Sequence, residues 1–161
     1  MSRKLRLYLD TSVWSFAFAE DVPDYRDATR EFFRLARGGV FELFGSQVVR
    51  AELGRTKDSD LRSAFARLYE SLPVRNLEVT PEALALARKY LDAGVLPLKS
   101  EDDALHVALA TVNDVSVVVS WNFKHLANVS RNDRFRSVNL VEGYTLDLRI
   151  VNPLEVQDEG T

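Results

Sequence analysis

The apolar run VSVVVS, residues 115–120, is the feature that most constrains the fold of this chain. Its valines lack the polar alternation of a half-exposed strand, which is typical of a strand buried on both faces of a parallel sheet. Such a strand has to be covered by helices on both sides. Further strands are expected over residues 5–10 and 40–46, with a short extended piece at 76–79 and one or two late strands within 138–156.

Helical patterns fill the segments between these strands. Ser46 and Thr80 are placed as N-caps, and Gly38 ends a long amphipathic pattern. Ser100 and Asp103 have the spacing of a capping box. Helices are expected over residues 11–20, 23–37, 46–56, 58–72, 81–93 and 100–110, with a short helix at 121–126 and a polar turn or helix at 131–138.

Strands that alternate with helices predict an α/β protein, a three-layer α/β/α sandwich around a central, mainly parallel sheet. A chain of 161 residues has the size of one domain. We expect residues 1–155 to form that domain and residues 156–161 to be a flexible tail. No apolar run approaches the about 18 residues of a membrane span. The start of the chain also lacks the apolar stretch of a signal peptide, so we expect a cytoplasmic protein with no membrane partner.

The composition limits the chemistry that the chain can perform. It has no cysteine and only two histidines. Disulfides, thiolate nucleophiles and cysteine-bound metal centres are therefore excluded. With so few nitrogen ligands, a bound metal is expected to be a hard cation held by oxygen, Mg²⁺ or Mn²⁺. The net charge of −3 provides no overall attraction to nucleic acid.

Polar residues collect at one end of the predicted sheet. Asp10 ends the first strand and Asn122 follows the buried run, while Glu52 and Asp103 lie on helices expected near the same end. Ligands of parallel sheets bind outside the carboxyl ends of the strands. Carboxylates that converge there repel one another unless a divalent cation compensates them, and Mg²⁺ suits a few such side chains with room for water. The sequence therefore predicts an acidic metal site.

Each of these residues also has a purely structural interpretation. Asp10 could cap the turn after its strand, and Glu52 could pair with a neighbouring arginine. Asp102 and Asp103 both lie in the first turn of a helix, where acids are favoured by about 0.3–1 kcal/mol. Because adjacent helical residues point about 100° apart, we expect Asp103 to face the site and Asp102 to complement the helix dipole. His106 is interpreted as a buried, hydrogen-bonded histidine rather than a ligand.

Four stretches of the chain together resemble the PIN domain family, in particular the VapC-like toxin ribonucleases. They occur in the family's order, and the likeness runs from Leu5 to about Pro153. The stretches are LYLDTSV around Asp10, SQVVRAEL around Glu52, DDALHVALA around Asp103 and VVVSWNFKHL around Asn122.

This resemblance implies a compact α/β/α fold and an acidic site, dependent on Mg²⁺ or Mn²⁺, that cuts RNA to leave a 5′-phosphate and a 3′-hydroxyl. Asp10, Glu52 and Asp103 match the three acidic positions of the family. Asn122 stands where many members carry a fourth aspartate, so it brings an amide oxygen but no charge. The hydroxyl positions that support the acids are matched by Thr11, Ser12, Ser46 and Ser120.

We therefore expect a metal-dependent endoribonuclease. Asp10 and Asp103 would hold the metal, Glu52 would reach it through water or act as the base, and Asn122 would order the attacking water. Phosphate contacts are expected from Arg50, Arg55, Lys124, Arg131, Arg134 and Arg136, and base stacking from Trp14 or Trp121.

The resemblance also implies a cognate antitoxin and a homodimer, and two other functions stay open. One is a catalytically inactive PIN-like scaffold that binds RNA or a protein partner, which Asn122 favours and the three intact acids disfavour. The other is a phosphotransferase with an aspartyl nucleophile at Asp10. It is disfavoured because Ser12 stands where such enzymes carry a second aspartate.

Overall fold

The computed structural model describes residues 4–159 and confirms the α/β prediction. All strands are parallel and form one sheet in the order β3-β2-β1-β4-β5, so β1 lies in the middle. All residues of β4 are buried, as predicted from the apolar run at residues 115–120. The strands are β1 (Leu5–Leu9), β2 (Phe41–Ser46), β3 (Val74–Leu77), β4 (Val117–Val119) and β5 (Arg149–Val151).

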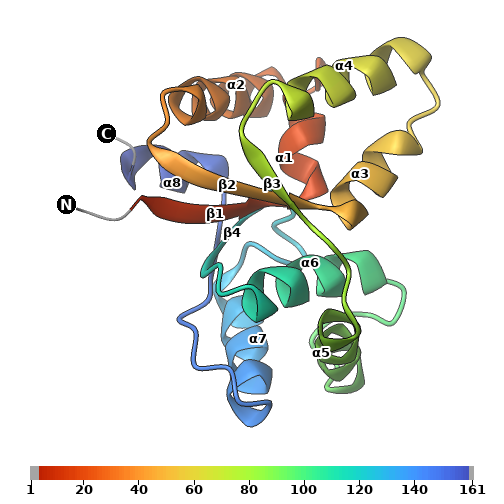
Figure 1. Cartoon of the computed structure of the whole chain (residues 1–161), viewed down its shortest axis with the longest axis vertical. Coiled ribbons are helices and arrows are strands. Elements are labelled where there is room, and N and C mark those ends of the chain that lie inside the picture. Colours follow the sequence, from red (N-terminus) through yellow and green to blue (C-terminus); the bar gives the residue numbers. More distant parts are fainter. Residues whose placement is uncertain (1–3, 160–161) are drawn as a thin grey trace.

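Helices cover both faces of this sheet (Figure 1). The helices are α1 (Thr11–Phe16), α2 (Pro23–Arg37), α3 (Gln47–Gly54), α4 (Ser59–Glu70), α5 (Pro81–Asp92), α6 (Glu101–Val112), α7 (Val129–Val141) and α8 (Pro153–Glu159). One layer contains α1, α2, α4 and α8, and the other contains α5, α6 and α7 (Figure 1). The short α3 contacts helices of both layers. Within the described residues, no helix is both long enough and apolar enough to cross a membrane.

Local side-chain chemistry explains most helix starts. The Ser46 hydroxyl accepts from the Val49 N–H at 3.2 Å, and the Thr80 hydroxyl accepts from the Ala83 N–H at 3.2 Å, so both predicted N-caps are confirmed. The predicted capping box at the start of α6 is wrong. Ser100 precedes the helix but makes no side-chain capping bond.

Two segments differ from the sequence prediction, and one helix spans the expected domain boundary. Residues 121–126 form a turn rather than a short helix, and the Asn122 carbonyl oxygen closes it by accepting from Leu126 N–H at 3.0 Å. The first late strand is absent because α7, capped by Asn128, continues to Val141. The domain boundary expected at residue 156 falls inside α8, which Asn152 caps through the Leu154 N–H at 2.9 Å.

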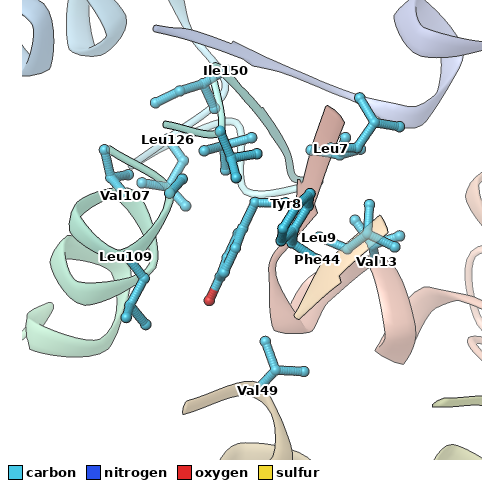
Figure 2. Packing of buried hydrophobic residues seen from close by; sticks show 14 of the residues in the cluster. Leu7, Tyr8, Leu9, Val13, Phe44, Val49, Val107, Leu109, Leu126 and Ile150 are labelled. Carbon is cyan, nitrogen blue, oxygen red and sulfur yellow. The ribbon is translucent and has the colours of Figure 1, made fainter. Parts of the chain in front are cut away.

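The core around β1 connects the sheet to the functional end of the molecule. Leu7, Tyr8 and Leu9 are fully buried, and successive side chains of a strand point to opposite faces. Tyr8 points toward the layer that contains α6. Figure 2 shows its hydroxyl directed into the space between Leu109 of α6 and Val49 of α3. A polar atom of the core therefore lies where these two helices meet.

Gly45 allows the ring of Tyr69 to lie directly against β2. A Cβ atom on Gly45 would be 2.1 Å from the Tyr69 hydroxyl oxygen and 2.8 Å from its Cζ. The Tyr69 hydroxyl donates to Asn76 Oδ1 at 2.6 Å, and its ring lies 4.8 Å from that of Trp14, so the ring is held in place. Close approach therefore requires glycine at this position.

Gly45→Ala is expected to lower the free energy of unfolding by about 1–3 kcal/mol, because the added methyl group overpacks the strand against Tyr69. Urea denaturation measures the change. Gly54→Ala is the matched control: nothing lies within 4 Å of its Cβ position, and alanine in α3 should be neutral or stabilising. Equal losses in the two variants would contradict this account of the strand.

Candidate active site

The site lies where the chain crosses from one half of the sheet to the other. β1 leads to β2 and β3 on one side, while β4 and β5 pair on its other side. In an open parallel sheet, ligands bind outside the carboxyl ends of the strands at such a switch point. Asp10 follows β1 directly, and Ser120 and Asn122 follow β4. The Asp10 N–H donates to the Val119 carbonyl at 3.1 Å, which keeps the two strand ends side by side.

Asp10 is buried at this switch point and is held by hydroxyl groups. Its Oδ1 accepts from the Ser12 N–H at 3.0 Å and from the Ser12 hydroxyl at 2.5 Å, so it also caps α1, as the structural interpretation proposed. Burial raises the pKa of the Asp10 carboxyl, while His106 and hydrogen bonds from Ser12 and Ser120 oppose the shift. The carboxylate thus carries a desolvation cost that a bound cation would relieve.

Asp103 and Asn122 meet across the crevice. The Asn122 amide Nδ2 donates to Asp103 Oδ2 at 3.2 Å, and Asn122 Oδ1 accepts from the His125 N–H at 3.0 Å. Asp102 points elsewhere. Asp102 lies in the first turn of α6, and its half-exposed carboxylate is 3.7 Å from the guanidinium of Arg55 at the end of α3. The two adjacent acids therefore have different environments, as their angular separation on the helix requires.

Glu52 ends a chain of hydrogen bonds that begins in the core. The Tyr8 hydroxyl lies 2.7 Å from Ser46 Oγ and 2.7 Å from His106 Nδ1. His106 Nε2 lies 2.7 Å from Glu52 Oε1, and because a carboxylate only accepts, the imidazole N–H donates. Thr11 donates its hydroxyl to the same oxygen at 2.8 Å. Glu52 is therefore fixed by a buried histidine and a hydroxyl, and not by the arginine pairing that the sequence also allowed.

Three carboxylates share one buried counter-charge. Among residues 4–159, His106 is the only buried side chain that can carry a positive charge. Burial alone would lower the pKa of His106, but the hydrogen bond to Glu52 and the charge of Asp10 raise it. Burial would raise the pKa of Glu52, yet His106 and Thr11 hold it below its usual value. Burial, with the charges of Asp10 and Glu52, raises the pKa of Asp103 to about 6 despite His106.

The donor set suits a hard divalent cation. Carboxylate and amide oxygens are the ligands that Mg²⁺ and Mn²⁺ prefer, and both ring nitrogens of His106 are already hydrogen-bonded. Within the described part of the chain, no three His, Cys, Asp or Glu side chains meet as a ready-made metal cage. Mg²⁺ does not require one, because it keeps several waters and uses one or two carboxylates. Asp10 and Asp103, each with a raised pKa, fit this open kind of site.

The predicted hydroxyl residues all lie in the site. Ser12 bonds to Asp10 and Thr11 bonds to Glu52. The Ser120 hydroxyl accepts from the Asn122 N–H at 2.9 Å and lies 3.5 Å from the Ser12 hydroxyl. Ser46 supports the site indirectly, through Tyr8 and as the cap of α3.

The predicted phosphate contacts fall into two groups. Lys124 and Arg50 are exposed, and the Arg50 guanidinium lies 5.2 Å from the centre of the Tyr69 ring. Arg131 and Arg134 each donate to a main-chain carbonyl in the turn after α5, and Arg136 pairs with an acid at 2.9 Å. These three arginines thus have structural partners, and their contact with RNA stays a prediction.

The expected base stacking by tryptophan is wrong. Trp14 is fully buried and Trp121 is only 3% exposed, with its indole N–H donating to the Thr29 hydroxyl at 2.7 Å. The role of Tyr8 in holding His106 was not predicted from the sequence. A tyrosine within a buried strand could have indicated it, because a buried hydroxyl needs a polar partner.

Comparison with known proteins assigns a fold and a family. The sequence model of the PIN domain matches residues 7–139, which contain all four predicted catalytic residues. VapBC2 from Rickettsia felis, bound to a DNA fragment from its promoter, has a TM-score of 0.59 at 14% identity, covering 92% of this chain and 98% of that one. VapC20 of Mycobacterium tuberculosis, a sarcin-ricin loop cleaving toxin, has a TM-score of 0.58 at 18% identity, covering 89% and 98%.

VapBC-1 from nontypeable Haemophilus influenzae has a TM-score of 0.57 at 16% identity, covering 93% of this chain and 99% of that one. No curated protein matches the chain by sequence. At these identities the structural likeness establishes the fold alone, and the family assignment depends on the sequence model.

Asp103→Asn is expected to stabilise the metal-free protein at pH 8. The pKa of Asp103 is about 6 in the folded protein and about 4 in an unfolded chain, so the fold favours the protonated acid. The protonated Asp103 carboxyl therefore contributes stability that is fully present below about pH 4 and is lost as the pH rises through about 6. The variant should therefore gain about 1–3 kcal/mol at pH 8 and nothing below about pH 4.

Urea unfolding in EDTA at pH 4, 6 and 8 measures this difference. Asp102→Asn is the matched control, since its exposed ion pair should change stability by less than about 0.5 kcal/mol. A loss of stability in Asp103→Asn at pH 8 would show that the ionised Asp103 carboxylate does not destabilise the folded protein as predicted.

His106→Gln is expected to lower the free energy of unfolding at pH 7 by about 2–4 kcal/mol, because Glu52 loses its only buried cationic partner within the described residues. Tyr8→Phe removes one neutral hydrogen-bonding group and should cost about 1 kcal/mol. Chemical denaturation of both variants compares the two values. If Tyr8→Phe is the more damaging change, the chain of hydrogen bonds does not depend on the histidine as described.

Proposed function

The chain belongs to the PIN domain family, and on that premise we propose that it is a metal-dependent endoribonuclease that hydrolyses RNA phosphodiester bonds. One observation carries the proposal: Asn122 contacts Asp103 at the switch point that Asp10 also occupies. Residues from three distant parts of the sequence thus meet where an open parallel sheet binds its ligand. The carboxylate oxygens of Asp10 and Asp103 are ligands of the kind that a phosphate-cleaving metal site uses, and the Asn122 amide N–H faces Asp103.

In the proposed mechanism, Asp10 and Asp103 would hold Mg²⁺ or Mn²⁺, and a cation bound there would supply stabilisation of negative charge on the phosphate and activation of water. Glu52, oriented by His106 and Thr11, takes the proton of the attacking water or reaches the metal through a water molecule. The Asn122 amide, fixed by the turn that follows it, orients that water. The water oxygen bonds to phosphorus, the bond to the 3′-oxygen breaks, and protonation gives a 3′-hydroxyl and a 5′-phosphate.

The alternative is a catalytically inactive scaffold that binds RNA or a protein partner. Asn122 favours it, because the amide brings no charge where many family members carry an aspartate. The pKa of Asp103 argues against it, since burial and three neighbouring acids raise the pKa of this carboxyl to about 6. A perturbed acid that costs stability is more common at functional sites than in scaffolds.

We further propose that the protein is the toxin of a toxin–antitoxin pair, that it forms a homodimer and that it acts in the cytoplasm. The likeness in fold to VapC20 and to the VapBC proteins above supports the toxin and its antitoxin, whereas the homodimer and the cytoplasm rest on the resemblance to the VapC-like toxins alone. A small protein encoded next to this chain that forms a complex with it and blocks its activity would support this part of the proposal.

Cleavage of a mixed pool of labelled single-stranded and hairpin RNAs tests the nuclease proposal. Wild-type protein should cut in Mg²⁺ or Mn²⁺ and not in EDTA. Asp103→Asn should reduce the rate by at least about a hundredfold, because it removes a metal ligand, while Asp102→Asn should retain it within about twofold.

The two variants each remove one carboxylate charge, at adjacent positions, so they have the same net charge and control for each other. Equal cutting by all three proteins would indicate a contaminating ribonuclease. No cutting by folded wild-type protein with either metal would favour the scaffold. End-group analysis of the products should show a 5′-phosphate and a 3′-hydroxyl, because in the proposed step water attacks phosphorus and the 3′-oxygen leaves.

A further inference from the structure

Four aromatic rings form a continuous cluster beside the acidic residues. The ring of Tyr25 lies 4.7 Å from that of Trp121, and Phe16 stacks on Tyr25 at 6.0 Å. Phe123 lies 5.9 Å from Trp121 and 6.1 Å from Tyr25. Trp121 is the buried floor, whereas Tyr25 is 39% exposed and Phe123 is 43% exposed. We call Tyr25 and Phe123 the aromatic rim.

Phe123 of the aromatic rim and Trp121 beneath it are the sequence neighbours of Asn122. Phe123 follows Asn122, whose amide donates to Asp103 at 3.2 Å. The Trp121 N–H donates to the Ser12 hydroxyl at 2.9 Å, and the same hydroxyl donates to Asp10. A group lying on the rim would therefore be a neighbour of the phosphate that the acids are proposed to cut.

Basic side chains surround His125, in the same loop as Phe123. Burial lowers the pKa of His125, and the charges of Arg131, Lys124 and Lys99 lower it further; both lysines are exposed. By contrast, α2 carries Asp24 and Asp27 near Tyr25, and the one basic neighbour, Arg26, is paired with Asp27 at 3.0 Å. A polyanion crossing this surface would therefore pass along the lysine side, with its uncharged parts toward the rim.

We propose that Tyr25 and Phe123 form a stacking site for one unpaired nucleobase of an RNA whose phosphates pass beside Lys124. The RNA class rests on the proposed function, and the stacking site adds which RNA is bound. Exposed rings stack on any base, whereas the bases of a duplex are stacked on one another and cannot reach a protein ring. The site therefore selects RNA with an unpaired nucleotide next to the cleaved bond.

Binding measured without metal tests this site separately from catalysis. The probes are a fluorescein-labelled 12-nucleotide single-stranded RNA of mixed sequence and a labelled 12-base-pair RNA duplex, both in EDTA, followed by anisotropy. Tyr25→Leu and Phe123→Leu keep apolar volume but remove the ring. Each should weaken single-strand binding about five- to tenfold and leave duplex binding unchanged.

Tyr25→Phe keeps the ring and should retain the wild-type affinity within about twofold. Tyr144→Leu removes a ring in the loop between α7 and β5, outside the cluster, and should also have no effect. Lys124→Ala should reduce the dependence of log affinity on log salt by about one unit, whereas the leucine variants should not change that slope. Circular dichroism and thermal unfolding confirm that each variant is folded.

Three results would overturn the stacking site. They are unchanged affinity in both leucine variants, an equal loss for single-stranded and duplex RNA, and no binding of single-stranded RNA by the wild type. The last would leave a protein partner as the occupant of the rim. If the rings matter for binding but the wild type never cuts RNA, the stacking site stands and the nuclease proposal fails. If the wild type cuts and the leucine variants bind like it, the nuclease proposal stands alone.

Discussion

The hydrogen bond from His106 to Glu52 is the contact on which the rest of the site depends. It brings the one buried basic side chain of the described residues to a carboxylate that lies partly in the protein interior. The imidazole is fixed in turn by the Tyr8 hydroxyl, at 2.7 Å from Nδ1, and Tyr8 is part of the central strand. A buried charge pair is tolerated when further hydrogen bonds satisfy both partners, and here they do. The same chain of contacts joins β1, α3 and α6, so the core and the site are built together.

The sheet topology creates the crevice in which the site lies, and the buried acids in this crevice lower the stability of the fold. In this parallel sheet the strand order reverses between β1 and β4, which leaves a crevice at the carboxyl ends of two strands. Asp10 follows β1 directly, and Asn122 lies three residues after the end of β4. Burial raises the pKa of Asp10, and burial together with the charges of neighbouring acids brings the pKa of Asp103 to about 6. An arrangement that lowers stability in the absence of a ligand is common at functional sites, where the ligand restores the balance.

Much of this arrangement follows from local features of the sequence. The uninterrupted valines of β4 indicate a strand buried on both faces, and that alone requires helices on two sides. Once the strands are predicted, the polar residues that follow their carboxyl ends, such as Asp10 and Asn122, are predicted to lie at the ligand-binding edge of the sheet. The contact between Tyr8 and His106 spans 98 positions, and no local pattern reveals it. The end of α7 was mistaken for a strand because Leu140 and Val141 are apolar yet 64% and 82% exposed, which removes the helical burial pattern. The exposure of an aromatic ring also depends on the fold, and the sequence analysis therefore chose the two tryptophans over Tyr25 and Phe123.

The central claim is that the acids at this switch point hold a divalent cation. Titration of ¹⁵N-labelled protein with Mn²⁺, followed by the paramagnetic broadening of backbone amide signals, tests it without any assay of activity. The account predicts that the signals of Asp10, Asp103 and Asn122 broaden first and that excess Mg²⁺ restores them. Broadening that begins at the acidic start of α2, or no broadening near Asp10 and Asp103, would contradict it.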